Sequence, residues 1–252
     1  MNDKYPLIFS DEVDSTNEVL LTEARKGAPE WTTIVAHYQT AGKGQGKNNW
    51  VSKKSENILM SVLLKPVISD ISQIFLLNKA IAVAISKFSS NFIENERVFI
   101  KWPNDILIDQ NKISGILIEN SFTDSKIEFS IVGIGFNVNQ IVFPDFSPKA
   151  TSLALVCKRK FEIKKLVSAL IDHISMEYNF FSIQVNHKNI EQEYHKKLFN
   201  RNKRTSFLLN NKMIELTPKE VNNFGQLVTE DKNGKIVCYD AGMLKQFEFV
   251  TK

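Results

Sequence analysis

Apolar residues recur along the chain with two spacings, and these spacings predict most of its secondary structure. Segments that alternate, or that are continuously apolar and rich in β-branched residues, predict strands. They span residues 7–9, 32–38, 57–64, 97–101, 105–109, 112–119 and 126–139. Short polar turns such as Asp109-Gln110-Asn111 join several neighbouring segments, so we expect a mixed, mainly antiparallel sheet.

Apolar positions three or four residues apart predict helices, which we expect to pack on the sheet. These helices span residues 15–26, 71–88, 162–180 and 188–198. The first begins with Ser15, followed three residues later by Glu18. This is the spacing of a capping box, and the helix is expected to end at Gly27.

Short strands return from Thr205 onward, and Asp231-Lys232-Asn233-Gly234 has the composition of a hairpin turn. No internal repeat or low-complexity segment interrupts the chain. The change of pattern predicts two parts. The first is an α+β domain over residues 1–199, and the second is a small all-β domain over residues 200–252.

Composition and charge narrow the classes of function. The 252 residues are 43% hydrophobic and 24% charged, which is typical of a globular protein. The net charge of +4 is spread along the chain and favours an anionic small ligand or an acidic partner over specific DNA binding. Neither Cys157 and Cys238 nor the four histidines have metal-binding spacing. Without a signal peptide or an apolar run of about 20 residues, we expect a cytoplasmic protein with no membrane partner.

The strongest chemical signal is Lys101-Trp102-Pro103-Asn104-Asp105, followed by Lys112 beyond a polar turn. It places two lysines and a carboxylate close together on neighbouring strands. A solvated, charge-paired hairpin is the alternative, and such surface pairs are common. Pro103 breaks the strand ladder, however, so we expect the backbone to bend around a ligand. A nucleotide with magnesium is the obvious candidate, because it brings anions and a metal to one place.

Three further segments add weaker signals. Residues 41–49 alternate glycine with lysine and glutamine, which suits a loop that turns N–H groups toward an anion, or a flexible surface loop. This loop lacks the Walker pattern. Ser15-Thr16-Asn17 is a helix start that could also face a polar ligand. Gly133 and Gly135 within a strand indicate either a close backbone approach or a β-bulge.

Five segments together resemble biotin protein ligases in their order and spacing. They are Asp14-Ser15-Thr16-Asn17, residues 39–45, residues 101–105, Lys112-Ile113-Ser114-Gly115 and residues 133–137. The resemblance covers residues 7–180 well and the C-terminal segment more loosely. It implies a catalytic domain like that of class II aminoacyl-tRNA synthetases, followed by a small SH3-like β-barrel.

The resemblance also implies a two-step reaction. Biotin is activated by ATP to biotinyl-5'-AMP with Mg²⁺ as cofactor, and is then transferred to a lysine of a biotin carboxyl carrier protein. Both steps develop negative charge that fixed cations and N–H groups stabilise. Thirteen residues precede Asp14, which are too few for a helix-turn-helix, so no DNA binding is expected. The sequence leaves open whether two copies of the chain form a homodimer by pairing the edges of their sheets.

Carried over position by position, the resemblance assigns the site residues. Lys112, Lys43 and Asp105 are expected to be catalytic, with Asp105 also the magnesium ligand. Biotin contacts are expected from Ser15, Thr16, Asn17, Gln39, Gly42, Lys43, Gly44, Gln45, Lys112, Gly115, Gly133 and Gly135. ATP contacts are expected from Lys43, Gly44, Gln45, Trp50, Lys101, Asn104, Asp105, Lys112 and Asn137.

The sequence departs from the family pattern in the glycine loop, where Lys43 and Gln45 stand in place of arginines. Lysine keeps the charge but loses the bidentate fork, and glutamine loses the charge, so weaker retention of the adenylate is expected.

The alternative to a biotin protein ligase is a lipoate or octanoate ligase or transferase, because these enzymes share the fold type and a catalytic lysine. A non-catalytic nucleotide-binding module is a third interpretation, which the presence of Lys112 disfavours.

Overall fold

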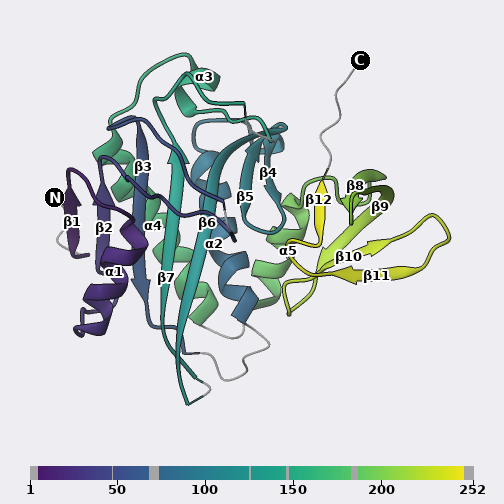
Figure 1. Ribbon diagram of the computed structural model, residues 1–252, viewed down its shortest axis with the longest axis horizontal. Helices are drawn as coiled ribbons and strands as arrows, with labels where there is room; N and C mark the ends of the chain where they lie inside the picture. Colours follow the sequence, from purple (N-terminus) through teal and green to yellow (C-terminus); the bar gives the residue numbers. More distant parts are fainter. Residues whose placement is uncertain are drawn as a thin grey trace.

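The structure is a computed structural model that describes residues 5–46, 48–67, 74–124, 126–145, 148–182 and 187–246. Within these ranges the main sheet has seven strands in the order β1-β2-β3-β7-β6-β5-β4 (Figure 1). The strands are β1 (Leu7–Ser10), β2 (Thr33–Ala36), β3 (Asn57–Leu64), β4 (Val98–Lys101), β5 (Asp105–Ile108), β6 (Asn111–Thr123) and β7 (Lys126–Asn137). β1 and β2 run parallel, and the other described neighbours pair antiparallel. The expectation of a mixed, mainly antiparallel sheet is confirmed.

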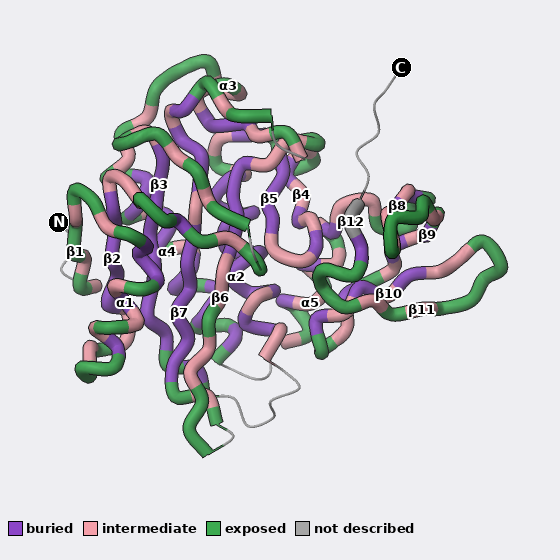
Figure 2. The backbone as a smooth tube through the Cα atoms, in the orientation of Figure 1, coloured by how far each residue is buried: buried purple, intermediate pink, exposed green. Residues whose placement is uncertain are grey.

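Helices cover both faces of this sheet. Helices α2 (Ile74–Ser89), α4 (Ile163–Ser182) and α5 (His187–Lys197) pack together on one face, with the short α3 (Leu153–Cys157) nearby (Figure 1). Helix α1 (Thr16–Arg25) lies on the other face, where Leu20 and Ala24 form a second small core with Leu63 and Phe129. Coverage on both faces explains why β3 is buried along its whole length (Figure 2). Residues 71–73, expected to begin α2, lie outside the described ranges.

The predicted capping box at the start of α1 is wrong. Ser15 occupies the N-cap position, but its side chain makes no capping hydrogen bond. The Glu18 carboxylate accepts a hydrogen bond from Lys43 of the glycine loop instead of reaching back to the helix start. The helix N-terminus is therefore built into a tertiary contact, which local spacing does not reveal.

A second sheet forms the C-terminal part of the chain. Its described strands are β8 (Thr205–Leu209), β9 (Lys212–Val221), β10 (Leu227–Glu230), β11 (Ile236–Tyr239) and β12 (Leu244–Gln246), in the order β11-β10-β9-β8-β12. The predicted hairpin turn is confirmed, since Asp231 N–H donates to Lys235 O at 2.9 Å and Gly234 has a φ of +81°. Among the described helices of either part, none is both long and apolar enough to cross a bilayer.

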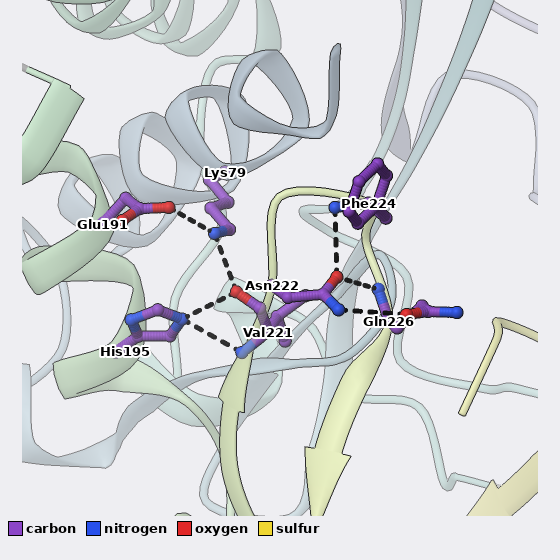
Figure 3. Close-up of polar contacts among 7 residues, drawn as sticks. All are labelled: Lys79, Glu191, His195, Val221, Asn222, Phe224 and Gln226. Carbon is purple, nitrogen blue, oxygen red and sulfur yellow. Dashed lines mark hydrogen bonds and ion pairs between the residues drawn. The ribbon is translucent and has the colours of Figure 1, made fainter. Parts of the chain in front are cut away.

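A polar cluster around the buried Lys79 links helices α2 and α5 to the C-terminal sheet (Figure 3). Lys79 of α2 is 1% exposed, and its ammonium donates to Glu191 Oε1 of α5 at 2.7 Å and to Val221 O of β9 at 2.8 Å. His195 Nε2 lies 3.0 Å from the N–H of Val221 and 3.1 Å from Val221 O, so its tautomer decides whether it accepts from the one or donates to the other. Burial, and next the charge of Lys79, lower the pKa of His195. The cluster thus holds the end of β9 against helices α2 and α5.

Candidate functional site

A cavity of about 740 Å³ lies where the start of α1, the glycine loop of residues 41–49, the β4–β5 turn and the C-terminal sheet meet. The middle of β6 and β7 forms one of its walls through residues 115–117 and 133–135. All but one of the predicted site residues line this cavity. They are Ser15, Thr16, Asn17, Gln39, Lys43, Gly44, Gln45, Trp50, Lys101, Asn104, Asp105, Lys112, Gly115, Gly133, Gly135 and Asn137.

The exception is Gly42, which lies behind the loop and is buried. A Cβ at this position would lie 2.6 Å from Trp50 O and 2.8 Å from Gln39 Nε2, so the glycine is required by packing within the protein. The loop also folds back on itself, since Lys43 pairs with Asn49 and Gly44 N–H donates to Asn48 O at 2.8 Å. Residue 47 of this loop lies outside the described ranges.

One end of the cavity is polar and densely hydrogen-bonded. The N–H of Thr16 donates to Gln39 Oε1 at 2.8 Å. Ser61 Oγ lies 2.7 Å from the Thr16 hydroxyl and 2.5 Å from Asn17 Oδ1, and Asn17 Nδ2 donates to Glu119 at 2.6 Å. Sequence reasoning missed Ser61 and Glu119. A polar residue within the apolar run of β3 was the available signal for Ser61, whereas Glu119 had none.

The cationic groups lie along the same cavity. Lys101 and Asp105 are directly opposite each other on β4 and β5, and Lys112 Nζ lies 2.7 Å from Asp105 Oδ1. These two paired side chains are 26% and 12% exposed, so water screens them only in part. Lys43 bonds to Glu18 near the surface, and this bond raises the pKa of Lys43. Lysines from a loop and from two strands therefore share one cavity.

Asp105 is the carboxylate that could hold a metal. Its Oδ1 is buried and, apart from the ion pair with Lys112, makes no directed hydrogen bond in the described structure. The described residues contain no cluster of three or more histidine, cysteine or acidic side chains. Magnesium needs no such cluster, because one or two carboxylates together with substrate phosphates and water are its usual ligands. The donor set thus fits Mg²⁺ delivered with a nucleotide.

Asn104, in the β4–β5 turn, is bonded within the protein. Its side-chain amide donates to Ile116 O at 2.7 Å and fixes this turn.

The indole of Trp50 lies against the two central glycines of the wall. A Cβ at Gly135 would come within 2.3 Å of the ring, and one at Gly115 within 3.0 Å. No β-bulge interrupts the pairing of Gly133 or Gly135 with β3 or β6, so close approach explains these two strand glycines. Lys112 Nζ lies 5.4 Å from the centre of the indole, within range of a cation–π contact. Trp50 Nε1 is buried and has no partner among the described residues, which leaves a donor for a ligand.

The C-terminal sheet supplies part of the cavity wall, which the sequence did not reveal. Trp102, in the β4–β5 turn, is 8% exposed, and its indole N–H donates to Gly225 O at 2.8 Å. The wall here is mostly apolar. Its residues beyond the first domain are Phe207, Pro218, Leu227, Gly242 and Leu244. The site is therefore completed by both parts of the chain.

The arrangement defines a class of ligand. The cavity combines a polar end with fixed donors and acceptors, three lysines, and an aromatic and apolar wall. This combination suits an elongated ligand that carries an anionic group. Such a combination is typical of proteins that bind a small acid together with a nucleotide.

Comparisons with known proteins identify the family. Residues 9–137 match the model of the biotin/lipoate A/B protein ligase family, and the chain belongs to this family. It is 38% identical over 161 residues to the bifunctional ligase/repressor BirA of Bacillus spizizenii, covering 62% of this chain and 48% of that protein. It is 31% identical over 145 residues to the biotin–[acetyl-CoA-carboxylase] ligase of Mycobacterium tuberculosis, covering 56% and 52%. These matches span about half the length of both relatives.

The fold is also found among solved structures. The biotin protein ligase from Aquifex aeolicus, in complex with biotin and ATP, superposes with a TM-score of 0.79. The superposition covers 97% of this chain and 99% of that one, at 24% sequence identity. The likeness therefore includes the C-terminal sheet, and it confirms the predicted α+β architecture of a sheet-and-helix domain followed by a small β-domain.

Proposed function

We propose that the protein is a biotin protein ligase. It activates biotin with ATP to biotinyl-5'-AMP and then transfers biotin to a lysine of a biotin carboxyl carrier protein. The observation that carries this proposal is the placement of Lys112 in the cavity, 2.7 Å from Asp105 and 5.4 Å from the centre of the Trp50 ring. Family membership and the cavity shared by the lysines at 43, 101 and 112 support it.

The first step needs an oxygen of the biotin carboxylate to attack the α-phosphorus of ATP, which expels pyrophosphate. Negative charge accumulates at the phosphoryl oxygens as the bond forms. Lys112 and Lys101 face this charge from fixed strands, so little reorganisation is needed when it develops. Magnesium, held by Asp105 together with phosphate oxygens, would neutralise part of the triphosphate charge.

In the second step the acceptor amine attacks the acyl carbon of the adenylate, and AMP leaves. Lys112 would again stabilise the oxygen that gains charge, because its ammonium faces the same cavity in both steps. The acceptor is a carrier domain, whose lysine must reach the cavity from outside.

Lipoate is the alternative acid within this family. Its dithiolane ring offers no N–H donor or carbonyl, so it could not use the hydrogen-bonding capacity that Thr16, Asn17 and Gln39 retain beyond their contacts within the protein. A cyclic urea supplies both kinds of group. The polar end therefore favours biotin over lipoate.

The test compares Lys112→Ala with wild type in pyrophosphate release from biotin and ATP with Mg²⁺. Loss of a group that stabilises transition-state charge typically lowers the rate by about 10²–10³-fold. Lys165→Ala is the matched control, since Lys165 is an exposed lysine of α4 that pairs with Glu162. Unchanged pyrophosphate release in Lys112→Ala would show that the assignment is wrong. Release that depends on lipoate or octanoate instead of biotin would identify the alternative acid.

A further inference from the structure

A chain of four hydrogen-bonded side chains runs from the surface of β6 to the polar end of the cavity. Asn17 Nδ2 donates to Glu119 Oε2 at 2.6 Å, and Asn17 Oδ1 lies 2.5 Å from Ser61 Oγ. Ser61 Oγ lies 2.7 Å from the Thr16 hydroxyl. The last three residues are buried, whereas Glu119 is exposed. A surface charge is thus connected to the wall of the cavity.

Strand geometry explains the position of Glu119. Side chains two residues apart on a strand share a face, and Gly115 and Leu117 of β6 both line the cavity. Glu119 is the next residue on this face. Leu117 pairs with Gly133 of β7, where a Cβ would come within 2.3 Å of Asn17 Oδ1. The glycine therefore leaves the room in which the Asn17 amide meets Glu119.

The charge of Glu119 sets the direction of every bond in this chain. A carboxylate can only accept, so the Asn17 NH₂ group must face it and the Asn17 carbonyl must face Ser61. That carbonyl can also only accept, so Ser61 gives it its single hydroxyl proton. Ser61 then presents only lone pairs to Thr16. The Thr16 hydroxyl lies 2.7 Å from Ser61 Oγ and 3.1 Å from Gln39 Oε1. It donates to Ser61, the nearer acceptor, because two oxygens this close need a proton between them.

The consequence reaches the cavity at Thr16. Having given its proton to Ser61, the Thr16 oxygen can only accept a further hydrogen bond there. We propose that Glu119 is a positioning residue that orients this chain so that Thr16 accepts from an N–H of the ligand. A cyclic urea has ring N–H groups that match this acceptor. The inference rests on the proposed function, which supplies biotin as the urea.

The test measures biotin affinity by calorimetry without ATP, in wild type, Glu119→Gln, Asn17→Ala and the double variant. A glutamine amide can donate or accept, so it keeps the shape of Glu119 but no longer fixes the direction of the chain. We expect Glu119→Gln to raise the Kd for biotin about three- to tenfold, the range expected for a partly exposed charged hydrogen bond. In the Asn17→Ala background the same substitution should have no further effect, because the link is already absent.

The control is Glu128→Gln, an exposed carboxylate on β7 that bonds to Ser121 and Thr123 away from the cavity. It should leave the Kd for biotin unchanged. The KM for ATP should be unchanged in Glu119→Gln, and its melting temperature should equal that of wild type because Glu119 is exposed. A general loss of structure would instead alter all three quantities.

Each outcome is decisive. If wild type binds biotin and Glu119→Gln binds it equally well, Glu119 does not position the site. If Glu119→Gln weakens binding equally with and without Asn17, the charge acts by another route and the inference is also overturned. If wild type itself does not bind biotin, the proposed function is wrong, and the inference that rests on it is overturned with it.

Discussion

Replacing Glu191 by glutamine should destabilise the protein more than removing the buried lysine that it contacts. The Lys79 ammonium is 1% exposed and has Glu191 Oε1 and Val221 O as partners (Figure 3). Glu191→Gln leaves this ammonium buried without a counter-charge. Lys79→Met removes the buried charge and fills similar space. It loses the hydrogen bond to Val221 O and the pairing with Glu191, but Glu191 is partly exposed and water can solvate its carboxylate.

The burial of the two side chains sets the size of each expected loss in the free energy of unfolding. Breaking a buried ion pair by removing one partner costs about 3–5 kcal/mol when both charges are fully buried. Because the Glu191 side chain is 36% exposed, solvent screens it in part, and we expect a loss of about 1–3 kcal/mol in the free energy of unfolding. For Lys79→Met we expect about 1 kcal/mol, the usual net worth of one hydrogen bond. The double variant should resemble Lys79→Met alone.

Urea unfolding followed by circular dichroism measures these differences, with the m-value checked for each variant to confirm that the transition is unchanged. Glu162→Gln is the control, since it removes the exposed pair with Lys165 and should cost less than about 1 kcal/mol. A loss for Glu191→Gln no larger than that of the control would refute the argument. A larger loss for Lys79→Met than for Glu191→Gln would refute it as well.

Three further predictions concern the site and its junction with the C-terminal sheet. Gly135→Ala should expel the Trp50 ring, which a Cβ would approach to 2.3 Å, and a tryptophan fluorescence spectrum identical to that of wild type would contradict this. Trp102→Phe removes the donor to Gly225 O and should lower the free energy of unfolding in urea by roughly 1–3 kcal/mol, whereas an unchanged value would show that the bond contributes nothing. Because the pKa of His195 is lowered in the folded state, its contribution to stability is complete above the unfolded pKa of about 6.5 and is lost as pH falls through the folded value. Thermal unfolding between pH 7.5 and 5 should therefore show a steeper loss for wild type than for His195→Gln, and parallel curves would count against it.

Regular elements were predictable because their cause is local. The continuous apolar run of β3 predicts a fully buried strand, and the helical spacing of apolar residues in α4 predicts a helix with one buried face. Both elements lie where expected. Contacts between distant segments have no such signal. Glu119 meets Asn17 across 102 positions of sequence, and Trp102 meets Gly225 across 123. The polar chain and the C-terminal wall of the cavity therefore emerged only from the fold.

The position of Lys112 shows how a small irregularity decides the chemistry. Lys112 and Gly115 are three residues apart, so in a regular strand their side chains would point to opposite faces. The pairing of β5 with β6 shifts between Ile106 and Leu107, so that Ile113 is an extra residue on β6 and has no partner in the ladder. This bulge returns Lys112 to the face of Gly115 and Asp105. The Lys112 ammonium accordingly lies 3.2 Å from where a Cβ of Gly115 would be, and 2.7 Å from Asp105. Spacing along the chain identified the lysine, but the bulge directs it into the cavity.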